Sequence, residues 1–214
     1  RYERQQKGRL KEFYQLNCDL ITEPGLLANV ESLADAEMIA LAIDLMREFK
    51  LGSNDVKVRL SDRSILNCLL DGAGVTDQAQ RAAAYGVIDK LWRMRPEQVL
   101  DIREGRDPRF PGAIGGRMLE VVSLKEWSDI RTALGTGPEA ITAAGCFDEV
   151  LSGLDHMGLS EFVDIDLSIV RGLAYYTGTV FEIFDVARSN RAIAGGGRYN
   201  DLLKLLGGVD QNAV

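Results

Sequence analysis

One arginine stands where a positive charge could meet an anion. Arg171 lies between Val170 and Gly172 in otherwise apolar sequence, and it leads into the adjacent residues Tyr175 and Tyr176. Burying a guanidinium in an apolar segment is costly unless it meets an anion. The spacing therefore indicates an anion-binding pocket at this point of the chain.

A second pair with chemical potential opens the chain. Arg1 and Glu3 are separated by one residue and share one side of an extended segment, where they could meet a phosphate and an amino donor together. An ordinary surface ion pair explains the same spacing.

Three adjacent glycines, Gly195, Gly196 and Gly197, follow the apolar run AIA. They mark a place where backbone meets another group closely, or else a bulged strand or tight turn. No third glycine follows to complete GxGxxG, and GxxxxGK[ST], HExxH and GxSxG are absent from the sequence. The lone histidine, His156, follows a helical pattern and is expected at the surface or as a helix cap rather than as a catalyst.

Residues 12–21 alternate as a strand does. Tyr14, Leu16, Cys18 and Leu20 share a predicted core face, while the opposite face carries Phe13, Gln15, Asn17, Asp19 and Ile21. A strand face with Gln, Asn and Asp at its middle is either solvated or lines a polar pocket.

Composition bounds the class of protein. The 214 residues are 46% hydrophobic and 27% charged with a mean hydropathy of −0.07, which excludes disordered, collagen-like and membrane classes. No run of about 18 apolar residues exists, and the first residues lack the apolar segment of a signal peptide. Three widely spaced cysteines and one histidine argue against a disulfide scaffold or a zinc site and favour a reducing cytoplasm.

The charge is uneven along the chain. Residues 1–15 hold five basic and two acidic residues, which gives them a charge of +3. Since the net charge of the chain is −7, residues 16–214 carry −10. The overall charge argues against a protein that coats nucleic acid, while a basic segment on an acidic body suits a small anionic substrate such as a nucleotide.

The elements that position these residues follow from hydrophobic periodicity. Residues 32–50 read as a helix that starts at a Ser32–Asp35 capping box, and residues 55–60 and 163–168 alternate as strands. Residues 75–160 are largely helical, with a loop at 106–117 and helix starts at Pro96 and Pro138. The apolar face of the first helix is expected at Met38, Ala42, Leu45, Met46 and Phe49.

The resulting order is strand, helix, strand, a helical block, two strands and a helix. Strands at both ends around a helical block predict an α+β fold with an antiparallel sheet and an inserted helical subdomain. The residues alone give an α+β domain with an anion pocket near Arg171, the glycine run and residues 13–19.

Three sequence strings carry a more specific likeness. RYERQQKGRLKEFYQLNCDLI (1–21) resembles motif 2 of histidyl-tRNA synthetases, RGLAYYTGTVFEIFD (171–185) resembles their histidine-specific motif, and AIAGGGRYNDLL (192–203) resembles their glycine-rich second histidine motif. The resemblance implies a class II synthetase-type antiparallel sheet flanked by helices, with a helical insertion domain, in a homodimer. It also implies ATP- and Mg²⁺-dependent activation of histidine to histidyl-adenylate and transfer to tRNA(His).

The resemblance implies roles at ATP. Arg1 would hold the α-phosphate, Glu3 the adenine amino group, Arg9 the outer phosphates, and Phe13 would stack on adenine. Arg171 would stabilise charge developing at the α-phosphate, which makes Arg171, Arg1 and Gln15 the expected catalytic residues.

It also implies roles at histidine. Gln15 would lie near the reacting carboxylate, and Asp19 and Tyr176 would bind the imidazole. Arg171, Tyr175, Tyr199 and the glycines Gly195, Gly196 and Gly197 would line the same pocket. No protein metal site is expected.

The chain departs from the family pattern at three positions. Ala174 and Asn200 stand where the family usually has Asp, and Gln5 stands where it usually has Pro. The loss of the acid at 174 changes the charge next to the expected pocket.

The strings also divide the chain. Residues 1–61 and 161–214 are expected to form two parts of a catalytic core around a helical insertion at 62–160. The core is expected to be incomplete at both ends, because motif 1, motif 3 and the anticodon-binding domain are absent. We therefore expect the 214 residues alone not to aminoacylate at a useful rate.

Two other readings stay open. A synthetase-like regulatory subunit of ATP phosphoribosyltransferase in histidine biosynthesis would bind histidine without charging tRNA. Such paralogues commonly lose ATP contacts, whereas Arg1, Glu3, Arg9, Phe13 and Arg171 are all present, which favours the synthetase. The second reading is a binding module of the same fold, without ATP or histidine.

Overall fold

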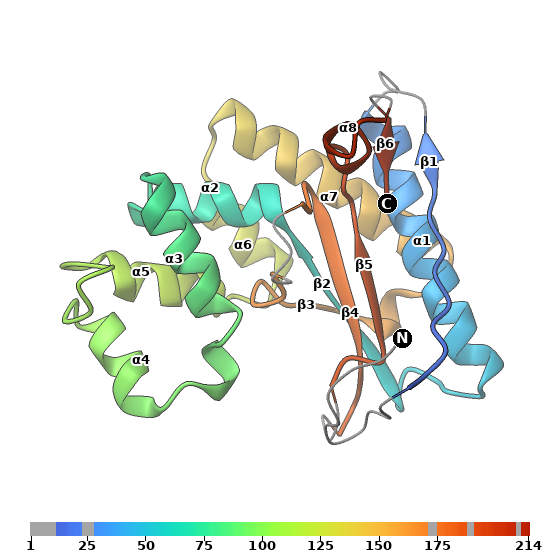
Figure 1. Ribbon diagram of the computed structural model, residues 1–214, viewed down its shortest axis with the longest axis horizontal. Coiled ribbons are helices and arrows are strands. Elements are labelled where there is room, and N and C mark those ends of the chain that lie inside the picture. The colour runs from blue at the N-terminus through green and yellow to red at the C-terminus, as the bar shows by residue number, and fades with distance from the viewer. Residues whose placement is uncertain (1–11, 23–27, 171–174, 188–190, 209–210) are drawn as a thin grey trace.

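The computed structural model describes residues 12–22, 28–170, 175–187, 191–208 and 211–214. Its centre is a four-stranded sheet in the order β3-β2-β4-β5, seen near the middle of Figure 1. The strands are β2 (Val56–Asp62), β3 (Val163–Ile165), β4 (Thr179–Asp185) and β5 (Ala194–Gly197). A separate two-stranded pair joins β1 (Ile21–Thr22) to β6 (Asn212–Ala213). The predicted order holds for the first long helix (Ala28–Glu48), β2, the helical block, β3 and β4, but β5 at the glycine run and β6 after the last helix were not in it.

Most of the sheet is antiparallel, but one pair is not. β4 runs antiparallel to both β2 and β5, whereas β2 and β3 run parallel over Val58–Leu60 and Val163–Ile165. A parallel pair needs a long crossover, and the helices between residues 63 and 156 supply it. The helical insertion therefore explains the local departure from the expected antiparallel arrangement.

Two long helices cover one face of this sheet. The predicted inward residues Val56, Val58 and Leu60 are buried, and they pack with Phe181 and Ile183 of β4. The covering helices are α1 (Ala28–Glu48) and α7 (Pro138–His156), which also contact each other. Alternating apolar residues on β2 and β4 thus form the floor of the main core.

Helix α1 begins earlier than expected. It starts at Ala28, so Ser32 and Asp35 lie inside it, both buried, and do not form a capping box at its start. The buried stripe passes through Ile39 and Ile43, while Phe49 is exposed. Ser and Asp are typical of helix starts, which is why the sequence predicts a start at Ser32. Inside α1 these residue types are tolerated because tertiary contacts bury them.

Most of the inserted helices share a second hydrophobic cluster, while Ile130 and Leu134 of the last one pack in the main core. The inserted helices are α2 (Arg63–Ala73), α3 (Gln78–Ile88), α4 (Pro96–Arg103), α5 (Ile114–Val122) and α6 (Trp127–Leu134), with a short 3-10 helix at Leu91–Arg93. Their cluster surrounds Phe110 and Met118 and reaches Val170. Pro96 and Pro138 open α4 and α7 as predicted, but the expected loop at 106–117 ends sooner, because α5 begins at Ile114.

Segment 12–21 is not the strand that its alternation predicts. Only Ile21 and Thr22 are assigned to β1, and the expected core residues Tyr14, Leu16 and Cys18 are exposed, Leu16 by 69%. Alternation supplies a face but not a neighbouring strand to pair with. Near its end this segment pairs with β6 at Ile21 and through the hydrogen bonds between Leu20 and Val214, and Glu12 forms a single isolated bridge.

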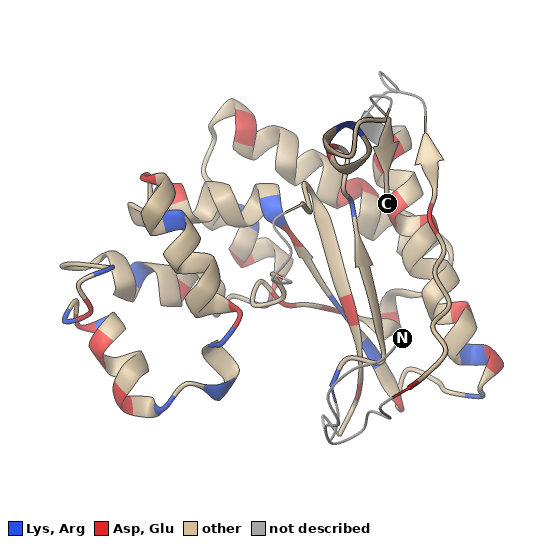
Figure 2. Ribbon diagram, in the orientation of Figure 1, with Lys and Arg blue, Asp and Glu red and all other residues tan. Residues whose placement is uncertain are grey.

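Acidic and basic residues are interspersed over α2 to α6, whereas α7 carries acidic residues and no lysine or arginine (Figure 2). The basic segment that the sequence places at residues 1–15 is described only from Glu12 onward. Within the described ranges, no helix has both the length and the apolar character needed to cross a bilayer.

Candidate functional site

Three tyrosines and one aspartate meet beside the end of β5. The hydroxyl of Tyr199 donates a hydrogen bond to Oδ1 of Asp19. The rings of Tyr175 and Tyr176 are 4.7 Å apart between centroids, and those of Tyr175 and Tyr199 are 6.2 Å apart and nearly perpendicular. Residues from the chain start, from before β4 and from after β5 thus form one small group, which we call the tyrosine–aspartate cluster.

The environment of this cluster keeps Tyr199 protonated. Partial burial raises the pKa of the Tyr199 hydroxyl, and the hydrogen bond and negative charge of Asp19 raise it further. The phenol is therefore a fixed donor to the carboxylate, which retains acceptor capacity for one more N–H donor.

The glycine run lies against aromatic rings. A Cβ added at Gly196 would be 2.9 Å from the ring of Phe181, and one at Gly197 would be 2.9 Å from the ring of Tyr176 and 2.6 Å from the carbonyl oxygen of Thr179. Side chains at these two positions would displace the rings or the strand. The predicted close approach of backbone to another group is confirmed, and Gly197 is what admits Tyr176 next to β5.

The other predicted residues have different outcomes. Gln15 is exposed, and its Nε2 donates to Oδ1 of Asn17 at 2.8 Å, while Phe13 is half-buried and Gly195 is exposed. Arg1, Glu3, Arg9, Arg171 and Ala174 lie outside the described residues. Their roles stay predictions, so the described part of the expected site is its histidine side.

His156 occupies the last position of α7 and is exposed, as predicted. Its Nδ1 lies 2.7 Å from the backbone oxygen of Ser152, one turn earlier in the same helix.

A buried arginine that the sequence reading did not single out lies between the glycine run and Tyr199. Arg198 is 6% exposed, and its guanidinium holds Asp35 of α1 with two contacts, Nε to Oδ2 at 3.1 Å and Nη2 to Oδ1 at 2.9 Å. Its Nη1 lies 3.4 Å from Oε2 of Glu31, and Nη2 donates to the backbone oxygen of Glu31. All three guanidinium nitrogens of Arg198 therefore have acceptors. Only the planar guanidinium of arginine can donate in several fixed directions at once.

Asn200 extends this arrangement. Its Oδ1 accepts from Nη1 of Arg198 at 3.2 Å and from the backbone N–H of Ala213 at 3.3 Å, and its Nδ2 donates to Oε2 of Glu31 at 3.4 Å. An aspartate here would set a second carboxylate against Glu31. The amide at this departure from the family pattern therefore fits its surroundings in this chain.

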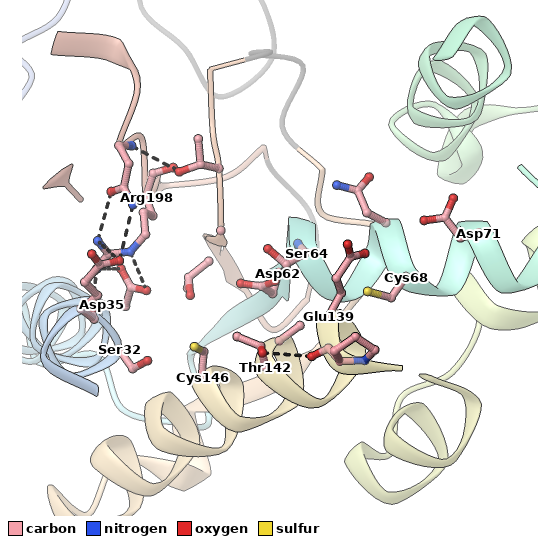
Figure 3. Close-up of a pocket in the computed structure, with 18 of the residues that line it drawn as sticks. Ser32, Asp35, Asp62, Ser64, Cys68, Asp71, Glu139, Thr142, Cys146 and Arg198 are labelled. Atoms are coloured by element: carbon pink, nitrogen blue, oxygen red, sulfur yellow. Dashed lines mark hydrogen bonds and ion pairs between the residues drawn. The ribbon is translucent and has the colours of Figure 1, made fainter. Parts of the chain in front are cut away.

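A cleft of about 690 Å³ opens on the far side of Arg198 (Figure 3). Its walls come from α1, α2, α7 and the turn before β4, and include Asp35, Asp62, Cys68, Cys146 and Arg198. Neither Asp19 nor any of the three tyrosines lines it. Arg198 and Asn200 thus separate two polar environments, the cleft and the tyrosine–aspartate cluster.

Asp62 is a buried carboxyl of the cleft that caps a helix. It is the N-cap of α2, and its Oδ1 accepts from the backbone N–H groups of Ser64 at 2.8 Å and Ile65 at 3.0 Å. Burial raises its pKa to about 6 against the stabilising effect of those hydrogen bonds, and the charge of Asp35 adds to the rise. The carboxyl is thus placed for helix capping at the cost of desolvation.

The cysteines of the cleft have raised pKa values, which lowers their thiolate fraction. Burial raises the pKa of Cys68 and Cys146, and nearby carboxylates raise it further. Both are free thiols, as is Cys18. The expectation of reduced cysteines is consistent with this arrangement.

The sequence also contains a signal for Arg198. The reasoning that selected Arg171, an arginine within apolar sequence, applies equally to Arg198, which follows three glycines. Asp35 is typical of a helix start by residue type, and only its place inside α1 shows that it pairs with Arg198.

The whole chain resembles proteins of known family. The family model described as histidyl-tRNA synthetase matches residues 1–214. A histidine–tRNA ligase of Opitutus terrae is 42% identical over 216 residues, covering 100% of this chain and 48% of the ligase. The chain spans about half the length of the curated relatives it matches.

Solved structures show the same fold. A histidyl-tRNA synthetase from Nostoc superposes with a TM-score of 0.74 at 22% identity, over 92% of this chain and 46% of the other. A protein from Bacillus halodurans, described as an ATP phosphoribosyltransferase regulatory subunit/histidyl-tRNA synthetase, gives 0.72 at 23% identity, over 91% and 48%. At these identities the likeness concerns the fold alone.

Proposed function

Since the chain belongs to the histidyl-tRNA synthetase family, we propose that it is part of the catalytic core of a histidine–tRNA ligase. The parent protein would activate histidine with ATP to histidyl-adenylate and transfer the histidyl group to tRNA(His). The tyrosine–aspartate cluster carries this proposal, because it joins an acidic acceptor to aromatic rings at the place where the family motifs put the substrate side chain.

The chemistry of the cluster suits an imidazole. Asp19 accepts from Tyr199 and has lone pairs left for an imidazole N–H, while Tyr175 and Tyr176 offer ring surfaces beside it. Asp19 is exposed in this structure, so a bound histidine would have to cover it before an analogue without the N–H would leave a buried carboxylate unpaired. Selectivity for histidine would come from this pairing.

The reaction itself needs positioning and positive charge more than acid–base chemistry. The histidine carboxylate would attack the α-phosphorus of ATP and expel pyrophosphate, and the terminal ribose hydroxyl of the tRNA would then attack the carbonyl carbon and expel AMP. We propose Arg1, Arg9 and Arg171 at the phosphates, Glu3 and Phe13 at adenine, and Gln15 at the carboxylate.

Magnesium is proposed only as the ion that accompanies ATP. Within the ranges that the structure describes, no group of three or more His, Cys, Asp or Glu side chains could hold a metal ion. No step is assigned to the ion. A homodimer, a cytoplasmic location and the division at residues 61 and 161 are proposed on the family resemblance, and the free cysteines agree with a reducing compartment.

The regulatory alternative has less support. The 42% identical relative is named a histidine–tRNA ligase, whereas the likeness to a protein whose description includes a regulatory subunit is at 23% identity. Full-length protein that stimulates ATP phosphoribosyltransferase and does not charge tRNA would reverse this choice.

The proposal is tested by substituting the cluster in the full-length protein that contains this chain. Loss of a hydrogen bond to a charged group corresponds to about 1.5–3 kcal/mol, so Tyr199→Phe and Asp19→Asn are expected to raise the KM for histidine by about 10- to 100-fold. The assay is histidine-dependent ATP–pyrophosphate exchange, followed by aminoacylation of tRNA(His).

The matched control is Tyr14→Phe, which changes a fully exposed tyrosine of the same N-terminal segment and should leave both assays unchanged. Wild-type protein without histidine-dependent exchange would contradict the proposed function. Exchange that is insensitive to both cluster variants would contradict the assigned site.

A further inference from the structure

Arg198 and Tyr199 are neighbours in the chain whose side chains serve two different environments. The guanidinium of Arg198 binds Asp35 and Glu31 on the side of α1, while the hydroxyl of Tyr199 reaches Asp19. Figure 3 shows Arg198 beside Asp35 at one end of the cleft. Whatever fixes the guanidinium therefore fixes the backbone from which the Tyr199 ring projects.

The end of strand β5 is also held by backbone hydrogen bonds, among them one from the N–H of Thr177 to the carbonyl oxygen of Arg198 at 2.8 Å. This strand is the edge strand of the sheet, four residues long, and it pairs with β4 alone from Ala194 to Gly197. Beyond Gly197, the backbone N–H of Arg198 donates to Thr179 at 2.8 Å, and that of Tyr199 donates to Ala213 at 2.8 Å. The edge thus continues into β6, which pairs with β1 and the segment that carries Asp19.

The side-chain network acts on the same two backbone segments. Asn200 binds the guanidinium through Oδ1 and accepts there from the backbone of Ala213, and its own backbone N–H donates to Oγ1 of Thr177 at 3.2 Å. The Nδ2 of Asn212, in β6, donates to Glu31. Arg198, Glu31 and Asn200 therefore join α1, β6 and the turn that follows Tyr176.

The network is buried, and its guanidinium contacts two carboxylates, although Nη2 of Arg198 meets Oδ1 of Asp35 as an ion pair without hydrogen-bond geometry. Asp35 is 4% exposed, so removing the arginine would leave a carboxylate without its partner in a poorly solvated place. Lysine would keep the charge, but as a point donor it cannot hold Asp35 with two contacts and Glu31 with a third. The planar guanidinium of Arg198, and not its charge alone, is therefore what fixes the arrangement of Asp35 and Glu31.

We propose that Arg198, held by Asp35 and Glu31, is a positioning residue that sets the place of the Tyr199 hydroxyl and, through it, of the Asp19 carboxylate that accepts the substrate imidazole. The inference rests on the proposed function of the tyrosine–aspartate cluster. Arg198 does not touch the substrate and acts through Tyr199. Its contribution is therefore to histidine affinity and not to ATP.

The test is Arg198→Lys in the full-length protein. A misplaced polar contact of this kind lowers binding by about 10- to 100-fold, so the KM for histidine in ATP–pyrophosphate exchange should rise by that factor while the KM for ATP stays within about twofold. Circular dichroism and Tm record the folded fraction separately. The control is Arg47→Lys, an exposed arginine of α1 paired only locally with Asp44, which should leave both KM values unchanged.

A double-mutant cycle identifies the route. If Arg198 acts through Tyr199, Arg198→Lys should cause little further rise in the histidine KM in the Tyr199→Phe background. Full additivity of the two effects would overturn the inference. So would a kcat that falls only with the folded fraction while both KM values stay at the wild-type level, because a purely structural role predicts that pattern.

A second variant covers the case in which Arg198→Lys does not fold. Asn200→Asp keeps the Oδ1 acceptor but sets a carboxylate against Glu31, and it should raise the histidine KM in the same direction. An unchanged KM in a folded Asn200→Asp protein would then overturn the inference. Wild-type protein that neither binds histidine in calorimetry nor catalyses exchange would instead overturn the proposed function, and this inference with it.

Discussion

The buried carboxyl of Asp62 should make the protein less stable as the pH rises. Its pKa is about 6 in the folded state against an ordinary value of 3.8, so between these values the folded protein binds more protons than the unfolded chain. The free energy of unfolding therefore falls with rising pH across this window. At 1.36 kcal/mol per pH unit, the interval corresponds to about 3 kcal/mol.

Asp62→Asn removes this penalty and keeps the cap. The amide oxygen can still accept from the backbone N–H groups of Ser64 and Ile65, and only the attraction of a carboxylate to the helix dipole, up to about 1 kcal/mol, is lost. The variant should be more stable than wild type by about 2 kcal/mol at pH 7.5. At pH 4, where the Asp62 carboxyl is protonated in the folded protein, the two should be nearly equal.

Urea unfolding followed by circular dichroism between pH 4 and 8 measures this difference. The control is Asp77→Asn, because Asp77 caps α3 but is exposed. Asp77 accepts from Ala79 through Oδ1 and from Gln80 through Oδ2, so the amide can keep only one of these bonds, and the variant should show no gain in stability at pH 7.5. A difference between Asp62→Asn and wild type that does not change with pH would refute the reasoning. So would a variant that is less stable at pH 7.5.

Three further predictions concern packing and charge, and each is measured as the free energy of unfolding. Gly197→Ala should lower the stability by about 1–3 kcal/mol, because the new Cβ meets strand and ring atoms. The control is Gly86→Ala in α3, where a Cβ has nothing within 4 Å and the stability should rise by about 0.5–1 kcal/mol. Equal effects of the two substitutions would contradict the steric argument. Phe147→Ala should cost about 3–5 kcal/mol, since the ring is fully buried; a loss below 1 kcal/mol would contradict its place in the core. Burial alone would raise the pKa of Asp166, but hydrogen bonds, chiefly from Lys125, lower it overall. Asp166→Asn should therefore be less stable than wild type near pH 7, and the two free energies of unfolding should converge as the pH falls below 3.8. A difference that stays constant with pH would contradict this.

Local signals predicted those features that depend only on neighbouring residues. The alternation of Val56, Val58 and Leu60 predicted a buried strand face, and Pro96 and Pro138 predicted helix starts, because both patterns act within a few residues. The glycine run predicted a close approach of backbone to another group. Which rings approach it, those of Phe181 and Tyr176, depends on pairing across β4 and β5.

The same kind of signal failed where partners decide the outcome. Alternation over residues 12–21 predicted a strand, but pairing needs a neighbour with free backbone groups, and in the described residues β6 provides only two paired positions. The predicted core face with Tyr14 and Leu16 is consequently exposed. Ser32 and Asp35 were predicted at a helix start by their residue types, whereas the helix begins at Ala28 and buries both.

The sequence by itself determined the family strings, the buried strand at 56–60 and the helical block that follows it, because these depend on residue identity and short spacing. The members of the tyrosine–aspartate cluster were implied by the family resemblance. Only the tertiary structure decided that Arg198 binds Asp35 across 163 residues of chain, and that this pair holds the strand end next to Tyr199. A charged residue in an apolar segment shows that a partner is needed, but not which one. The partner is chosen by the fold, which brings α1 against the edge of the sheet and excludes water from both side chains.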